Sequence, residues 1–70
     1  MNTYHIYSNQ GADFGTWTAE TEAHALYQMH LDAGVYGIEF NASEDRIIFT
    51  DAEMAELAGN VEDWTIEEIA

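Results

Sequence analysis

The amino-acid sequence predicts an α+β fold in which an antiparallel sheet of four to five strands is combined with two helices, in the order ββαββαβ. Two segments have the apolar spacing of helices, and the segments around them alternate or are rich in β-branched and aromatic residues, as strands are. Hydrophobic residues make up 47% of the 70, with two Trp, four Tyr and three Phe, which favours a folded chain over a disordered one. Because the chain is too short for two cores, we expect a single acidic α+β domain over residues 1–70.

A β-hairpin is expected at the start of the chain. Residues 3–8 alternate, with Tyr4 and Ile6 on one side, and residues 9–11 then turn the chain. Residues 14–19 return to strand-like composition. The connection is longer than the two-residue type of hairpin loop.

The first helix is expected to begin after Thr21, which can act as its N-cap, and to run to Asp32 or Ala33. Gly34 then supplies the C-terminal stop. The inward stripe of this helix is predicted to consist of Ala23, Leu26, Met29, His30 and Ala33.

A second hairpin is expected over residues 35–41 and 46–49, joined by the polar loop 41–45. In its first strand, Tyr36, Ile38 and Phe40 are predicted to face one way.

A short helix should follow, with Thr50 and Glu53 as its capping box and its end near Gly59 and Asn60. Its inward residues are expected to be Met54, Leu57 and Ala58.

Residues 61–69 fit either a helix or a strand, and we favour a strand because Trp64, Thr65 and Ile66 are strand formers. The core should contain Leu26, Met29, Ile38, Phe40, Ile47, Phe49, Leu57 and Trp64.

Nothing in the sequence has the pattern of an active site, so we expect no enzymatic activity, no cofactor and no metal. His24 and His30 are six residues apart, which places them about 240° apart on a helix, and His5 lies far away in sequence. The loop that begins at Asn41 lacks the central glycine and terminal glutamate of a calcium loop. With no cysteine, the chain has neither a disulfide nor a thiolate metal site, which fits the cytoplasm.

The charge is the extreme feature of the sequence, with fourteen Asp and Glu against one basic residue and a net charge of -13. Four of these carboxylates lie in residues 1–35 and ten in residues 36–70. Such a surface repels nucleic acid and acidic membranes and is attracted to basic grooves. The predicted partner-binding residues are the ten acids of the second half: Glu39, Glu44, Asp45, Asp51, Glu53, Glu56, Glu62, Asp63, Glu67 and Glu68.

The density of this charge is comparable with that of DNA. A compact domain of this length spans about 30 Å, over which duplex DNA carries about 17 phosphate charges. The acids could therefore imitate the DNA backbone in a basic groove.

In this overall character, short, free of lysine and strongly acidic, the chain resembles the phage-encoded anti-CRISPR proteins, several of which mimic DNA. Its segment GTWTAETEAHALYQMHLDAG (residues 15–34) is also similar to the strand-then-helix core of small bacterial and phage domains. The resemblance implies an inhibitor in the cytoplasm of a host cell that binds the basic DNA-binding surface of a CRISPR effector, without binding nucleic acid or membranes itself. Two alternatives stay open: an acidic interaction module that neutralises a basic toxin or nuclease, and an ordinary domain of a halophile.

Overall fold

The computed structural model describes residues 1–58 and 64–69, with the side chains of residues 57 and 58 left aside. The elements in chain order are β1 (Asn2–Ser8), β2 (Asp13–Ala19), α1 (Glu22–Asp32), β3 (Ile38–Asn41), β4 (Arg46–Phe49), α2 (Ala52–Ala58) and β5 (Trp64–Ile69). The α+β class and the order ββαββαβ are thus confirmed, and every strand pair is antiparallel. The strands are divided between a three-stranded sheet, β2-β1-β5, and a two-stranded sheet, β3-β4.

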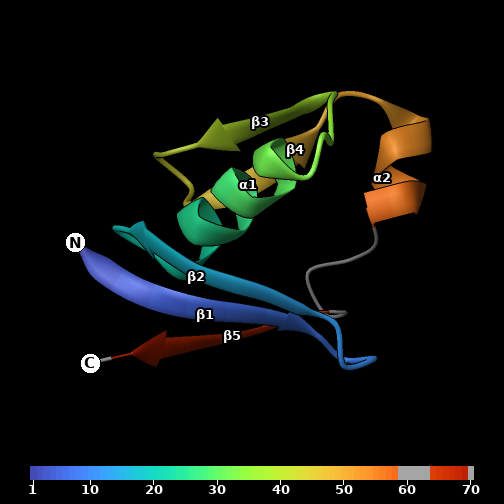
Figure 1. The fold of residues 1–70 in the computed structure, drawn as a ribbon. Helices are drawn as coiled ribbons and strands as arrows, with labels where there is room; N and C mark the ends of the chain where they lie inside the picture. Colours follow the sequence, from blue (N-terminus) through green and yellow to red (C-terminus); the bar gives the residue numbers. More distant parts are fainter. Residues whose placement is uncertain (59–63, 70) are drawn as a thin grey trace.

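The two sheets lie on opposite sides of α1, which contacts all five strands (Figure 1). α2 lies at one end of this arrangement, beyond β4, and the start of β1 lies beside the end of β5 at the other end. The molecule measures 35 × 30 × 19 Å along its principal axes. α1 therefore has apolar neighbours on two sides.

The three-stranded sheet is built around β1, whose Tyr4 and Ile6 are buried as the alternation predicted. The register of β1 with β2 shifts between His5 and Tyr7, which pair with Thr16 and Asp13. This bulge includes Gly15, whose φ of 83° is a left-handed conformation that glycine adopts without strain.

The first helix begins and ends where the sequence predicted. The Thr21 hydroxyl accepts a hydrogen bond from the His24 N–H at 3.2 Å, and Gly34 follows the last turn with a φ of 88°. Leu26, Met29 and His30 are buried as expected, together with Ala25. The predicted stripe was wrong at Ala33, which is exposed, and at Ala23, which is only half-buried. The stripe moved because α1 packs against layers on two sides, and because Ala33 is the cap residue beyond the last turn.

The second hairpin is shorter than predicted, since β3 begins at Ile38 and not at residue 35. Tyr36 is 61% exposed and does not share the inward face of Ile38. The reason lies at Gly37, which has a φ of 66° and whose C=O accepts a hydrogen bond from the Thr50 N–H at 2.7 Å. A Cβ at Gly37 would come within 2.5 Å of the Asp51 Cβ, so only glycine fits this close approach.

The predicted capping box of α2 was wrong, because Asp51 and not Thr50 caps this helix. The Asp51 carboxylate accepts a hydrogen bond from the Met54 N–H at 3.1 Å, and its C=O accepts one from the Ala55 N–H. Thr50 still belongs to the hairpin through its bond to Gly37, so the helix begins one residue later. Met54 is buried as expected, whereas the predictions for Leu57 and Ala58 concern side chains outside the described part.

The tail forms a strand over Trp64–Ile69, and the helical alternative is wrong for these residues. β5 pairs with β1 so that Ile66 lies opposite Ile6. The strand predicted for residues 61–63 lies outside the described residues.

The main core lies between α1 and the three-stranded sheet and not at the second hairpin. It consists of Tyr4, Ile6, Ala19, Ala25, Leu26 and Met29. Of the other residues predicted for the core, Ile38 is buried, whereas Phe40, Ile47, Phe49 and Trp64 are half-buried, and Leu57 lies outside the described side chains. The second sheet has only two strands, which leaves its side chains partly open to solvent.

Candidate functional site

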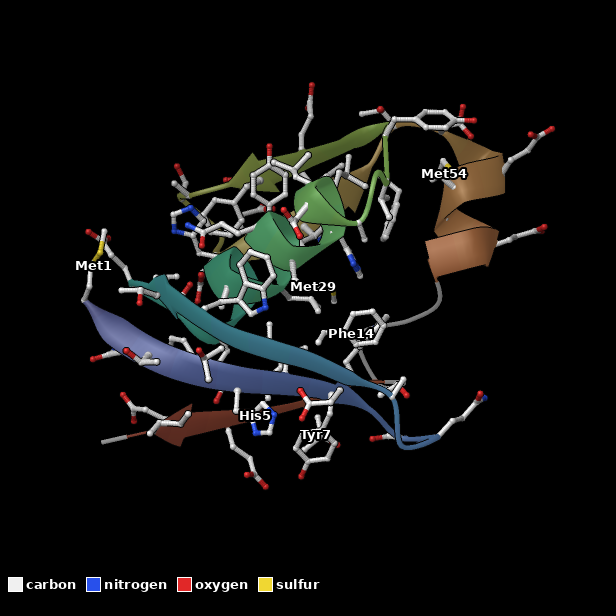
Figure 2. All side chains as sticks on the ribbon, viewed as in Figure 1. Met1, His5, Tyr7, Phe14, Met29 and Met54 are labelled. Carbon is white, nitrogen blue, oxygen red and sulfur yellow. The ribbon has the colours of Figure 1, made fainter. Side chains whose placement is uncertain are left out.

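The predicted partner-binding carboxylates lie on several elements of the fold. Glu39 is on β3, Glu44 and Asp45 are in the β3–β4 turn, Asp51, Glu53 and Glu56 are at or within α2, and Glu67 and Glu68 are on β5, whereas Glu62 and Asp63 lie outside the described residues. β3 lies on the other side of α1 from β5, and α2 lies at the end of the molecule beyond β4 (Figure 1). In the view of Figure 2, oxygen-tipped side chains project above β3, beside α2 and below β5. The described acids are therefore spread over elements on both sides of α1 and do not form a single flat patch.

Two of these acids stabilise the β3–β4 turn. The Arg46 Nε lies 2.9 Å from a Glu44 carboxylate oxygen, and the Glu44 N–H donates to the Asn41 side chain. Asp45 has a φ of 54°, and its carboxylate accepts a hydrogen bond of 2.6 Å from the Thr21 hydroxyl. This bond joins the turn to the N-cap of α1.

Two further acids have structural roles in other elements. Asp51 caps α2, as described above. The Glu67 carboxylate accepts a hydrogen bond of 2.7 Å from the Tyr7 hydroxyl on the neighbouring strand. This hydrogen bond, with smaller effects of burial and of the negative charge, raises the pKa of Tyr7 above its usual value.

The remaining four described acids of the set are Glu39, Glu53, Glu56 and Glu68, all exposed. Within the described part of the chain, none of these four side-chain carboxylates makes a hydrogen bond or an ion pair. Their full negative charge is therefore available to a partner.

The basic side chain of Arg46 offers almost no compensation for this charge. It is the one Lys or Arg of the sequence, and its pair with Glu44 is solvent-exposed on both sides. An exposed pair of this kind contributes about 0 to 1 kcal/mol and is screened by salt. The surface thus stays strongly negative.

A polar cluster that the sequence did not indicate lies on the face of the three-stranded sheet opposite α1. The His5 Nε2 is 2.9 Å from a carboxylate oxygen of Asp13, and the His5 ring lies 5.4 Å from the Tyr7 ring. A hydrogen bond from the Gly15 N–H, followed by the one to His5, lowers the pKa of Asp13. The alternation of β1 places His5 and Tyr7 on one face, but Asp13 joins them only because of the bulge.

The other two histidines have separate surroundings. His30 is 3% exposed and contacts the Trp64 ring edge-to-face, and burial lowers its pKa. His24 stacks on Phe40 with ring centroids 4.8 Å apart. Among the described residues, no group of three or more His, Asp or Glu is arranged to hold a metal ion.

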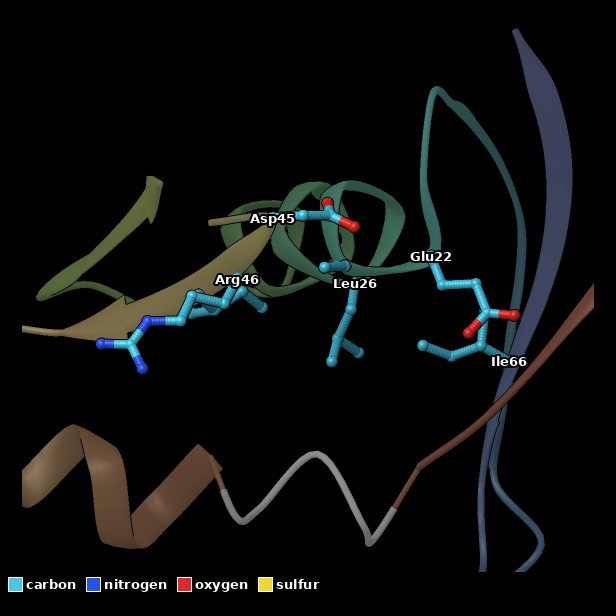
Figure 3. A pocket seen from close by; sticks show the side chains of 7 residues that line it. Glu22, Leu26, Asp45, Arg46 and Ile66 are labelled. Carbon is cyan, nitrogen blue, oxygen red and sulfur yellow. The ribbon is translucent and has the colours of Figure 1, made fainter. Parts of the chain in front are cut away.

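A cavity of about 350 Å³ opens beside the N-terminal half of α1. Its described lining residues are Glu22, Ala23, Leu26, Asp45, Arg46, Ile47 and Ile66. Figure 3 shows the Leu26 side chain between those of Arg46 and Ile66, with the Asp45 and Glu22 carboxylates nearby and the Arg46 guanidinium extending away. Sequence periodicity could not indicate this cavity, because its walls come from α1, β4 and β5.

None of the helices in the described part is both long and apolar enough to cross a membrane. The chain matches no protein family model, no curated protein and no solved structure.

Proposed function

We propose that the protein is an inhibitor that occupies the basic DNA-binding groove of a CRISPR effector complex by imitating the charge of DNA. The observation that carries this proposal is the charge density: a net charge of -13 on a body whose longest axis is 35 Å. Duplex DNA of that length carries about 20 phosphate charges, at one per roughly 1.7 Å. Fourteen carboxylates on this body are of the same order.

The distribution of the acids also supports this proposal. A basic groove gains much of its affinity for DNA from neutralising phosphates and releasing their counterions. Carboxylates that project from several sides can contact both walls of a groove at once, which a flat acidic patch cannot do. The inhibitor would act in the host cytoplasm, where it would meet the effector.

The choice of a CRISPR effector as the target depends on the resemblance to small acidic anti-CRISPR proteins. A basic toxin or nuclease would offer the same kind of positive surface. Both targets therefore belong in the binding test.

The first test is a competition between the protein and target duplex DNA for guide-loaded CRISPR effectors, measured by gel shift at several salt concentrations. The variant Glu53→Gln with Glu56→Gln removes two free charges from α2. We expect weaker inhibition, and a slope of log affinity against log salt that falls by about 2, since each phosphate-like contact contributes about one unit.

The matched control is Glu20→Gln with Asp32→Asn, which removes two exposed carboxylates outside the predicted set. It should lose less inhibition than Glu53→Gln with Glu56→Gln, because it keeps all ten predicted partner-binding acids, and circular dichroism should show that both variants are folded. If the protein and target DNA occupy the effector together, DNA imitation is wrong. Binding to a basic nuclease but to none of the effectors would instead assign the neutralising role.

A further inference from the structure

The cavity between α1, β4 and β5 has an apolar base formed by Leu26, Ile47 and Ile66. Leu26 is 1% exposed, whereas Ile47 and Ile66 are half-buried. Its volume of about 350 Å³ lies at the lower end of the roughly 300 to 1,000 Å³ that is usual for ligand pockets. A single large apolar side chain from another molecule would be a suitable occupant.

The rim of this cavity is acidic. The Asp45 carboxylate is held beside the start of α1 by its bond from Thr21, and Glu22 is the next residue along the chain. Arg46 also lines the cavity, but its charge is engaged by Glu44 at 2.9 Å. An occupant of the cavity therefore meets two exposed carboxylates and a cation that is already paired.

The two rim carboxylates also lie near the N-terminus of α1, where negative charge stabilises a helix through its dipole, and this accounts for part of their role. This role does not require an apolar cavity next to them. The combination of an apolar base and an acidic rim is the feature that indicates a ligand.

We propose that this cavity binds an aromatic side chain on a lysine- or arginine-rich segment of the partner protein. The proposal deepens the proposed function and rests on it in one respect, the basic character of the partner. Buried aromatic side chains are typical anchors of protein interfaces, and charged groups around them steer the approach. The anchor would add specificity that a mere match of charge density lacks.

Other occupants fit less well. The net charge of -13 repels nucleic acid and other anions, and it also opposes a second copy of the chain. A neutral apolar molecule would leave the two rim carboxylates without a counter-charge.

The test uses three pentapeptides and the ¹⁵N-labelled full chain, followed by NMR titration. The first peptide has a central Trp between two Lys on each side, the second replaces this Trp with Ala, and the third replaces the Lys with Gln. We expect the Trp–Lys peptide to bind about tenfold more tightly than either of the others, in keeping with an interface anchor. Its shifts should centre on Ala23, Ile47 and Ile66.

Two variants test separately how the apolar base and the acidic rim of the cavity contribute to binding. Ala23→Leu fills the cavity without a change of charge, and it should abolish the preference for Trp over Ala; Ala52→Leu, at an exposed helical alanine, is its control. Asp45→Asn keeps an acceptor for Thr21 and should weaken the Trp–Lys peptide severalfold, whereas Asp32→Asn at the other end of α1 should not.

Equal binding of the Trp and Ala peptides, or shifts spread over the carboxylates of all elements, would overturn the anchor. That result leaves the effector competition unaffected, because charge imitation does not need the cavity. Conversely, a Trp preference that Ala23→Leu removes would stand even if no CRISPR effector is inhibited. If Ala23→Leu does not fold, the binding of the three peptides to the wild type still shows whether an aromatic anchor is recognised.

Discussion

In the described part of the chain, His30 is the one polar or charged residue that is buried. It is 3% exposed and lies against Trp64 within the packed layers. Burial lowers its pKa from the usual value of 6.5, because the charged form loses its hydration. In the pH range just below 6.5, the unfolded chain therefore binds more protons at this site than the folded chain.

This difference predicts a loss of stability on acidification. The stability due to neutral His30 is fully present above the unfolded-state pKa and is lost as the pH falls through the folded-state pKa. Thermal unfolding is followed by circular dichroism at constant ionic strength, from about pH 8 to about pH 5. The wild-type midpoint should fall more, or rise less, on acidification than the midpoint of His30→Leu.

The comparison of variants is needed because carboxylate repulsion has the opposite effect. Protonation of the acids relieves that repulsion and favours the folded state at low pH. His24→Leu is the matched control, since it removes a histidine from the same helix and leaves His30 in place. Equal acid sensitivity in wild type and His30→Leu would show that His30 does not contribute.

At the scale of elements, variants of Asp51 test whether this acid stabilises the start of α2 through its capping hydrogen bond or matters only through its charge. Asp51→Ala removes the cap on the Met54 N–H and should lower the free energy of unfolding by about 0.5 to 2 kcal/mol in urea denaturation. Asp51→Asn removes the same charge but keeps a capping oxygen, so it should cost much less. A loss with Thr50→Ala as large as that with Asp51→Ala would restore the original capping box.

On the scale of the whole molecule, the excess of negative charge should make stability depend on salt. Fourteen carboxylates share a body with a radius of gyration of 11.4 Å, so their mutual distances are comparable with the Debye length of about 8 to 10 Å at ordinary ionic strength. We expect the melting midpoint to rise between about 0.01 M and about 0.3 M NaCl.

A control separates screening from the specific effects of salt. Glu53→Gln with Glu56→Gln should melt higher at low salt and gain less from NaCl, because two of the repelling charges are gone. A midpoint that does not change with salt would mean that the acids are too well separated to repel. A requirement for molar salt before any folding would instead indicate the domain of a halophile.

The sequence by itself determined the class, the order of elements and the bounds of α1. These properties depend on local patterns: the alternation around Tyr4 and Ile6, the cap at Thr21 and the stop at Gly34 lie within a few residues of what they specify. The net charge is also a property of composition alone.

Only the tertiary structure decided how the strands divide into two sheets, where the core lies and which acids are free. The late start of β3 depends on the approach of Gly37 to Asp51, and the engagement of Asp45 depends on Thr21, 24 positions earlier in the chain. Glu67 meets Tyr7 across 60 positions. Such contacts join segments whose local patterns carry no information about each other, so no spacing within a segment could have indicated them.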